Sequence, residues 1–216
     1  MDYFLLIINN LLEGTKVTLT VFALTWLFSI PLGLLLAMLR NLNIKGLAKI
    51  IDLYTWLIRG TPLLLQLFFV VYGLPILFGE FFLIPELLGA ILTFIINYTA
   101  YFIEIFRGGM NAIPKNQYEA SQVLSLNKKQ TFLYVILPQT IKKTLPSIAN
   151  ETITLIKDTA LVSAVAISDL MRNTKDQVAR DFRVEAYFLA AIIYLILTYV
   201  IVYIFKKIEK KKAYYR

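Results

Sequence analysis

A helix drawn through residues 87–106 would carry three polar side chains on one face. Asn97, Tyr101 and Glu104 stand at positions i, i+4 and i+7, a spacing that places them in one stripe. An amide, a phenol and a carboxylate in that order can donate and accept hydrogen bonds to a polar solute. The apolar residues around them give this helix a length that can cross a membrane. Ionisable groups inside a membrane are costly and normally face a cavity or a partner, so we expect these three residues to line a polar pathway.

Residues 145–167 carry a second stripe of the same kind. Thr154 and Lys157 share one helical face, and Glu151 and Asp158 flank it at i and i+7. These side chains can line the same cavity as the first stripe. In the alternative interpretation the charged groups pair with one another or cap helix breaks, and for Glu151 and Lys157 the two interpretations stay equally open.

Two residue types that often do chemistry are absent from the sequence. There is no histidine for general base work or metal binding, and no cysteine for a nucleophile, a disulfide or an iron–sulfur cluster. No GxxxxGK[ST] phosphate-binding loop occurs either. We therefore expect no catalytic residue, no metal site and no cofactor in this chain. Any energy from ATP that the protein uses must then be supplied by another chain.

The apolar residues predict the elements that position these stripes. They make up 58% of the 216 residues, the mean hydropathy is +0.68, and they fall in runs of roughly 20, the length of a membrane-spanning helix. We expect an all-α polytopic membrane bundle of about five spans, forming a single transmembrane domain over residues 1–216. The expected spans are 17–39, 57–78, 87–106, 145–167 and 186–205.

Basic residues alternate between rich and poor loops along the chain. Residues 107–143 carry six lysines and arginines against the single acid Glu119, whereas residues 79–86 carry none, and the tail from 206 to 216 is strongly basic. By the positive-inside rule the N-terminus lies outside and the C-terminus in the cytoplasm. The net charge of +8 is explained by lipid head groups and topology, so we expect no nucleic-acid partner. The first eight residues have no basic region or cleavage site, which favours a segment of the mature protein over a signal peptide.

The basic loop 107–143 contains a short helical pattern. Pro114 suits a first helical turn, and an apolar edge near helical spacing is given by Tyr118, Ala120, Val123 and Leu124. Such a helix either docks into a groove of a partner or lies on the membrane surface, and the spacing alone leaves both open.

The order of residues in this loop resembles the EAA loop of bacterial ABC-importer permeases. The resemblance is carried by Glu119-Ala120-Ser121, then Ser125, then Ile136-Leu137-Pro138. In that family the loop is the coupling helix that is seated on the ATPase subunit, and the usual pattern has Gly at the place of Ser125 and Ala at the place of Ser121. Serine is small enough for a tight corner but lacks the freedom of glycine at positive φ. The resemblance implies that ATPase coupling uses Tyr118, Glu119, Ala120, Ser121, Leu124 and Ser125.

Further motifs resemble the polar-amino-acid branch of the same family and cover roughly residues 59–163. They are Arg59-Gly60-Thr61-Pro62-Leu63-Leu64-Leu65-Gln66, Tyr72-Gly73-Leu74-Pro75, Tyr101-Phe102-Ile103-Glu104-Ile105-Phe106-Arg107-Gly108-Gly109, Asn150-Glu151 and Lys157-Asp158-Thr159-Ala160-Leu161-Val162-Ser163. The resemblance implies a type I importer in a bacterial cell membrane, with a pair of five-span permeases and two ATPases that hold ATP and Mg. It also implies an extracellular solute-binding protein that delivers an amino acid. One chain has a gate, a docking helix and a candidate site, so we expect a homodimeric permease core.

Three consecutive residues, Gly60, Thr61 and Pro62, interrupt the second expected span. Pro62 removes a backbone donor and can kink the helix, so this segment is a gate candidate, and a plain turn at a helix start explains it equally well. The pair Gly108-Gly109 indicates a helix end with a tight turn.

The balance of charge inside the spans gives an expectation about the substrate. Glu104, Glu151 and Asp158 face the single base Lys157, which favours a cationic amino acid such as arginine or lysine, and the argument rests mainly on Glu104. One alternative function is an ion-coupled secondary transporter in which Glu104 or Asp158 exchanges the coupling ion. Five spans and an intrusive cytoplasmic helix argue against it. A nontransporting membrane scaffold would leave the polar stripes without a purpose.

Overall fold

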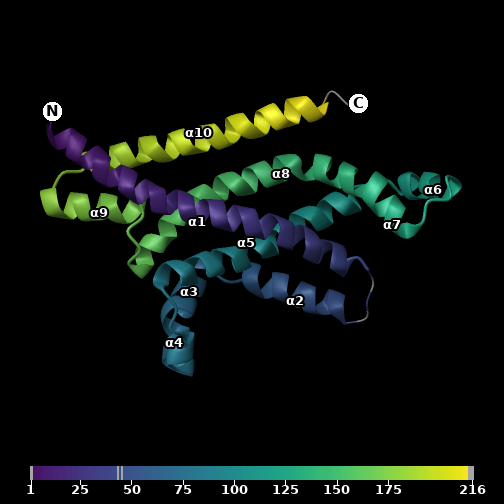
Figure 1. Cartoon of the computed structure of the whole chain (residues 1–216), viewed down its shortest axis with the longest axis horizontal. Helices are drawn as coiled ribbons and strands as arrows, with labels where there is room; N and C mark the ends of the chain where they lie inside the picture. Colours follow the sequence, from purple (N-terminus) through teal and green to yellow (C-terminus); the bar gives the residue numbers. More distant parts are fainter. Residues whose placement is uncertain (1, 43, 45, 214–216) are drawn as a thin grey trace.

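A computed structural model describes residues 2–42, 44 and 46–213 of the chain, and in them every regular element is a helix (Figure 1). The α-helices are α1 (Asp2–Arg40), α2 (Leu47–Arg59), α3 (Leu63–Phe68), α4 (Leu74–Phe78), α5 (Glu86–Asn111), α6 (Lys115–Val123), α7 (Lys128–Gln130), α8 (Leu137–Asp158), α9 (Leu170–Asp181) and α10 (Glu185–Ala213). Phe69–Gly73 and Thr131–Ile136 are π-helical turns, and Glu80–Phe82 and Thr159–Val165 are 3-10 turns. The predicted all-α fold is confirmed.

Three of the helices in the described part of the chain are long and apolar enough to cross a membrane: α1, α5 and α10. The pair Leu47–Arg59 and Leu63–Phe78, bent by 99°, makes a fourth if it is one span. The expected span 145–167 corresponds to the second half of α8 and the 3-10 turn after it, and its charged residues lower its hydropathy. The count of five spans and their boundaries therefore stay a prediction.

Helix α5 lies at the centre of the bundle, packed against α1, α2 and α8. Four of its five aromatic residues are buried, namely Phe94, Tyr98, Phe102 and Phe106. A Cβ on Gly33 of α1 would lie 2.5 Å from the Cβ of Phe102, so the absence of a side chain there lets the two backbones approach closely. This contact fixes α1 against the helix that carries the first polar stripe.

The far end of α5 packs tightly against α8. The helix continues through Gly108 and Gly109, where we expected it to end in a tight turn, and stops at Asn111. A Cβ on Gly109 would lie 2.1 Å from Cγ2 of Thr144 in α8, whereas a Cβ on Gly108 would meet nothing within 4 Å. Gly109 is therefore a helix-packing residue, and its neighbour is not.

Helix α9 packs against the N-terminal half of α1. The side chain of Asp169 caps α9 by accepting hydrogen bonds from the N–H groups of Met171 and Arg172. The hydroxyl of Thr18 accepts a further hydrogen bond from the backbone N–H of Leu170 at 3.2 Å. Gly14 approaches the same cap, because its Cβ would lie 2.6 Å from the carbonyl oxygen of Asp169. The N-terminal segment is thus tied into the bundle as the first turns of α1.

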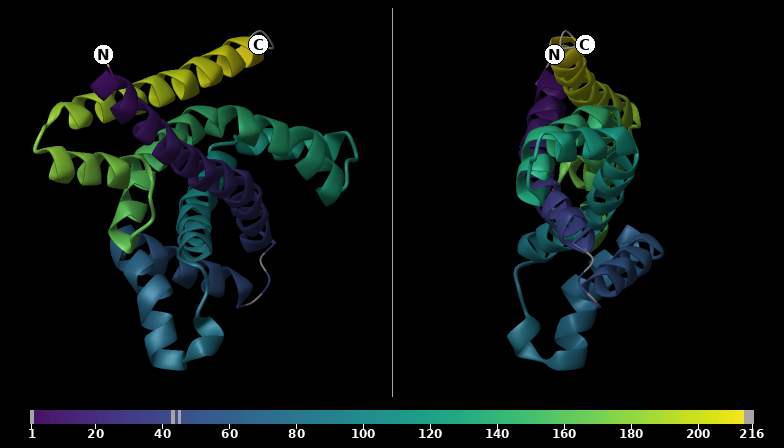
Figure 2. Two further views of the ribbon diagram at one scale, coloured as in Figure 1. Left: turned by 60° about the vertical axis from the view of Figure 1, so that its left-hand side comes forward. Right: turned by 90° about the vertical axis from the view of Figure 1, so that its right-hand side faces the viewer.

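Short helices lie at both ends of the bundle. Helix α9 lies beside the first turns of α1, and α6 and α7 lie at the far end (Figure 1). Helices α3 and α4 project from the body of the bundle (Figure 2). Met1, Lys45 and the last three residues of the basic tail, 214–216, lie outside the described residues.

Candidate functional site

A cavity of about 540 Å³ opens where the break between α2 and α3 faces α5 and α8. Seven of the nine predicted pathway and gate residues line it: Gly60, Thr61, Pro62, Asn97, Tyr101, Thr154 and Asp158. The two polar stripes and the span interruption, which are far apart in the sequence, therefore meet at one place.

The interruption at Pro62 has a clear physical cause. Proline has no N–H, so the carbonyl of Ile58, four residues earlier, loses its helical partner. The side chain of Gln66 replaces it, because Nε2 donates to the carbonyl oxygen of Ile58 at 2.8 Å and to Oγ1 of Thr61 at 2.7 Å. The predicted break in the helix is confirmed, and the role of this segment as a gate stays a prediction.

Asn97 connects this break to α5. Its Nδ2 donates to Oε1 of Gln66 at 3.0 Å, and Asn97 itself is buried. The amide therefore holds the start of α3 against α5 at the edge of the cavity. Gln66 was not predicted as a site residue, although it is the last residue of the motif that begins at Arg59. The signal for it was Pro62, because a proline leaves a carbonyl without its helical donor and a nearby amide can replace that donor.

Asp158, the last residue of α8, is oriented by a residue that the stripe did not include. The hydroxyl of Tyr98 donates to Oδ2 of Asp158 at 2.8 Å, and the ring of Tyr98 is buried in the bundle. Glu151 lines the same wall two helical turns earlier, beside Thr154. One wall of the cavity thus carries two carboxyl groups, one of them fixed by a hydrogen bond from α5.

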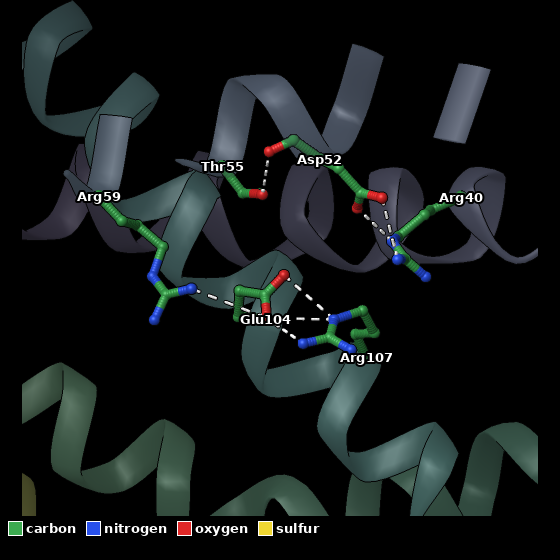
Figure 3. Close-up of polar contacts among 6 residues, drawn as sticks. All are labelled: Arg40, Asp52, Thr55, Arg59, Glu104 and Arg107. Carbon is green, nitrogen blue, oxygen red and sulfur yellow. Dashed lines mark hydrogen bonds and ion pairs between the residues drawn. The ribbon is translucent and has the colours of Figure 1, made fainter. Parts of the chain in front are cut away.

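Glu104 and Lys157 are the two predicted pathway residues that are not among the lining residues. The carboxylate of Glu104 pairs with Arg107, one turn further along α5, and lies 3.7 Å from Nη1 of Arg59 (Figure 3). Lys157 is exposed on the surface of this chain. The acid on which the expectation of a cationic substrate mainly rested is therefore already paired with cations of the protein.

Arg59 is a lining residue that the sequence did not single out. It ends α2, and its guanidinium lies over the ring of Tyr101, 5.4 Å from the ring centroid. The charged side chains that line the cavity, within the described part of the chain, are one base, Arg59, and two acids, Glu151 and Asp158. A site of this kind can bind a solute that carries both a negative and a positive group.

The predicted coupling segment forms α6, with Pro114 directly before its first residue. Gln117 ties this helix to α8, since its Oε1 accepts a hydrogen bond from Nε2 of Gln139 at 3.0 Å. The side chain of Ser121 is buried and donates to the carbonyl oxygen of Gln117. The exposed coupling candidates are Tyr118, Glu119, Ala120, Leu124 and Ser125. All but one of the predicted coupling residues are thus accessible to a partner.

Ser125 ends this segment in a left-handed backbone conformation, with φ at +55°. The N–H of Ser125 donates to the carbonyl of Gln122, and that of Leu126 to the carbonyl of Ser121. A residue with a Cβ is strained in this conformation, which is why glycine is favoured there. The corner expected from the loop pattern is present, with serine in it.

An all-helical bundle that has long apolar helices and a cavity lined by charged and polar side chains is typical of a membrane transport protein rather than of a soluble binding module. The model of the family "binding-protein-dependent transport system inner membrane component" matches residues 29–213, and the chain belongs to this family. The resemblance stated from the motifs is confirmed, and it favours the ABC importer over an ion-coupled secondary transporter.

The chain is similar over most of its length to curated permeases. It is 35% identical to the arginine transport system permease protein ArtQ of Bacillus subtilis (strain 168), over 93% of this chain and 91% of the relative. It is 33% identical to the glutamine transport system permease protein GlnP of Escherichia coli (strain K12), over 93% of this chain and 92% of the relative.

Solved structures agree with the fold. A crystal structure of an amino acid ABC transporter with histidines superimposes with a TM-score of 0.89 at 31% identity, covering 97% of both chains. The MetNI methionine ABC transporter in an inward facing conformation superimposes with a TM-score of 0.76 at 18% identity, over 94% of this chain and 95% of that one. The second likeness concerns the fold alone.

Proposed function

We propose that this permease moves a polar amino acid through the cavity between the α2–α3 break, α5 and α8. The observation that carries the proposal is that one base, Arg59, and two acids, Glu151 and Asp158, line the same cavity of about 540 Å³. An amino acid is a zwitterion, so it needs donors for its carboxylate and acceptors for its ammonium group, and this cavity offers both. The permeases named for arginine and glutamine transport that resemble the chain support the same class of substrate.

We further propose that the transported amino acid is cationic. One acid suffices for the α-ammonium group, which leaves a second carboxylate for a cationic side chain. The acids available for such a side chain are Glu151 and Asp158, because Glu104 is paired with Arg107. A comparison of ATPase stimulation by arginine, lysine, glutamine and histidine in the assembled transporter tests it. Stimulation by neutral amino acids at equal strength would remove the preference for a cation.

The proposed assembly has two copies of this chain, two ATPase subunits that hold ATP and Mg, and an extracellular solute-binding protein. Each copy contributes the single domain 1–216, with its N-terminus outside and its C-terminus in the cytoplasm. The position of α6 and α9 at opposite ends of the bundle supports this orientation (Figure 1). The homodimer is supported by the presence of a cavity and a docking helix in the same chain.

Coupling to the ATPase is proposed to run through the exposed face of α6. The test replaces Glu119 by Arg and Ala120 by Trp, two changes on exposed positions that leave the buried Ser121 and the link from Gln117 to α8 intact. We expect the permease to remain in the membrane and to lose ATP-dependent transport, because a bulky or oppositely charged face no longer fits the partner. Glu86→Arg, a matched change of an exposed glutamate in the first turn of α5, serves as the control. Unchanged transport by both α6 variants would show that α6 is not the coupling element.

A further inference from the structure

Glu104 is shared unequally between two arginines. Nε of Arg107 donates to both of its carboxylate oxygens at 3.1 Å, and Nη2 of Arg107 donates to Oε2 as well. Nη1 of Arg59 lies 3.7 Å from Oε2, which is an ion-pair distance but too long for a hydrogen bond. Arg107 therefore occupies the carboxylate, and Arg59 is attracted to it without being held by a hydrogen bond (Figure 3).

Arg59 keeps its donors free while its position is constrained. The guanidinium carbon lies over the ring of Tyr101, 5.4 Å from the ring centroid, and this cation–π contact constrains the position of the group. An arginine carries five N–H donors, and none of the described residues accepts a hydrogen bond from those of Arg59. The side chain is 41% exposed, and it lines the cavity. An arginine with no hydrogen bond to the described residues therefore lines the space in which the solute is expected.

The carboxyl groups stand on another wall of the same cavity. Glu151 and Asp158 come from α8, whereas Arg59 ends α2. Asp158 is fixed by the hydroxyl of Tyr98. The positive and negative charges thus come from different helices, and the cavity that they line can take a molecule with charges at two ends.

We propose that Arg59 binds the carboxylate of the transported amino acid, and that Glu104 and Tyr101 are positioning residues that hold its guanidinium. The inference rests on the proposed function, because it requires the solute to be an amino acid. Arginine suits this role, since its two parallel N–H groups match the two oxygens of a carboxylate. Glu104, which the sequence placed among the pathway residues, then acts on the substrate only through Arg59.

A purely architectural role for Arg59 predicts a different outcome. Arg40 and Asp52 form such a contact between α1 and α2, with Nε and Oδ1 2.5 Å apart (Figure 3). Neither residue lines the cavity. If Arg59 only held α2 against α5, its replacement would weaken the binding of every ligand alike. If it binds a carboxylate, only ligands that have a carboxylate lose affinity.

The experiment measures equilibrium binding to the purified permease–ATPase complex without the solute-binding protein. The probes are arginine, lysine, glutamine and histidine, together with the decarboxylated amine of whichever one binds; for arginine this is agmatine. We expect Arg59→Gln to weaken binding of the amino acid by about tenfold or more, the loss typical of a hydrogen bond to a charged group. Binding of the amine should not weaken, since the amine has no carboxylate to lose.

Matched variants separate the roles. Arg107→Gln changes the other arginine of the same ion pair and should leave both affinities within about twofold. Glu104→Gln should weaken binding of the amino acid less than Arg59→Gln does, and it should leave binding of the amine unchanged. If Glu104 contacted a cationic group of the ligand directly, Glu104→Gln would weaken binding of the amine as well. If Arg59→Gln does not assemble, Arg59→Lys is used, because lysine keeps the charge but lacks the two parallel N–H groups of the guanidinium. This variant should weaken binding of the amino acid and leave binding of the amine unchanged.

The outcomes that overturn the inference are specific. Unchanged affinity for the amino acid in the Arg59 variants, or an equal loss for the amine, would show that Arg59 does not bind the carboxylate. If the unaltered complex binds none of the four amino acids, the proposed function itself fails and the inference falls with it. If the unaltered complex binds an amino acid and Arg59→Gln weakens binding of the amino acid and of the amine equally, the inference about Arg59 fails and the proposed function stands.

Discussion

The close contact between Gly109 and Thr144 allows a sharp test of how α5 and α8 are held together. We expect Gly109→Ala to weaken this packing, because the new Cβ would lie 2.1 Å from Cγ2 of Thr144 and 3.3 Å from Cγ2 of Thr140. Carbon atoms prefer a separation of about 3.5–4.0 Å, so the helices must move apart by roughly 1.5 Å or the threonine must leave its rotamer.

The magnitude follows from the size of this overlap. Extra methyl groups in a well-packed core cost typically about 1–3 kcal/mol. A loss of about 2 kcal/mol in a chain of this length lowers the thermal midpoint by about 4 to 8 °C. The same movement would disturb α6, since Gln139 of α8 holds Gln117 of α6 by a hydrogen bond. We therefore expect the ratio of transport to ATP hydrolysis to fall together with the midpoint.

The neighbouring glycine provides the control. A Cβ on Gly108 meets nothing within 4 Å, so Gly108→Ala should leave the midpoint unchanged or raise it slightly through its better helix propensity. Thr144→Ser removes the methyl group that clashes and keeps the hydroxyl, which donates to the carbonyl of Thr140 at 3.0 Å. In the double variant, Thr144→Ser should restore a large part of the midpoint lost in Gly109→Ala.

The assay is thermal unfolding of the purified transporter in lipid nanodiscs, followed by ATPase and uptake measurements on the same samples. Equal midpoints for the two glycine variants would refute the packing argument. So would a double variant that is no more stable than Gly109→Ala, because the clash would then not be with the methyl group of Thr144.

Three further predictions follow from other parts of the chain. Ser125→Gly should raise the thermal midpoint by about 2 to 4 °C, because a side chain in the left-handed conformation costs about 1 kcal/mol; a lower midpoint would contradict the strain at φ +55°. Burial raises the pKa of Asp169, which caps α9, from 3.8 to about 6. The folded state therefore favours the protonated carboxyl group, and the stability that this proton contributes below about pH 4 is lost as the pH rises through 6. The unaltered protein should lose stability relative to Asp169→Asn between pH 4 and 7. A difference in stability between the two proteins that stays constant over this range would contradict the raised pKa. For the homodimer, coexpression of this chain with its ATPase alone should give an active complex, and a strict requirement for a second, different permease would refute it.

The sequence predicted those parts of the fold that depend on local patterns. The apolar runs gave the all-α bundle, and Pro62 predicted the break between α2 and α3, because the loss of one N–H donor acts on the nearest turn. The loop pattern likewise predicted α6 and the corner at Ser125. The loop pattern could not show that φ is positive at Ser125, because serine is also found in ordinary corners.

The partners of the charged groups were harder to predict than their helices. Helical spacing placed Glu104 beside Asn97 and Tyr101 but gave no information about which residues of α2 would face it, so the pair with Arg59 was missed. Tyr98, one residue after Asn97, was outside the stripe, yet its hydroxyl reaches Asp158 from the neighbouring face of α5. Gly109 was taken as the end of a helix, because a glycine that allows close packing and one that ends a helix look alike in a sequence.

The central claim, that this chain forms the substrate path of an ATP-driven amino-acid importer, is tested most directly by uptake into proteoliposomes. The vesicles contain this chain and its ATPase, and radiolabelled arginine or glutamine is offered with the solute-binding protein on the outside. We expect uptake that requires ATP in the lumen, and we expect Asp158→Asn, a change in the cavity wall, to reduce this uptake. Uptake driven by a proton or sodium gradient in vesicles without the ATPase would contradict it.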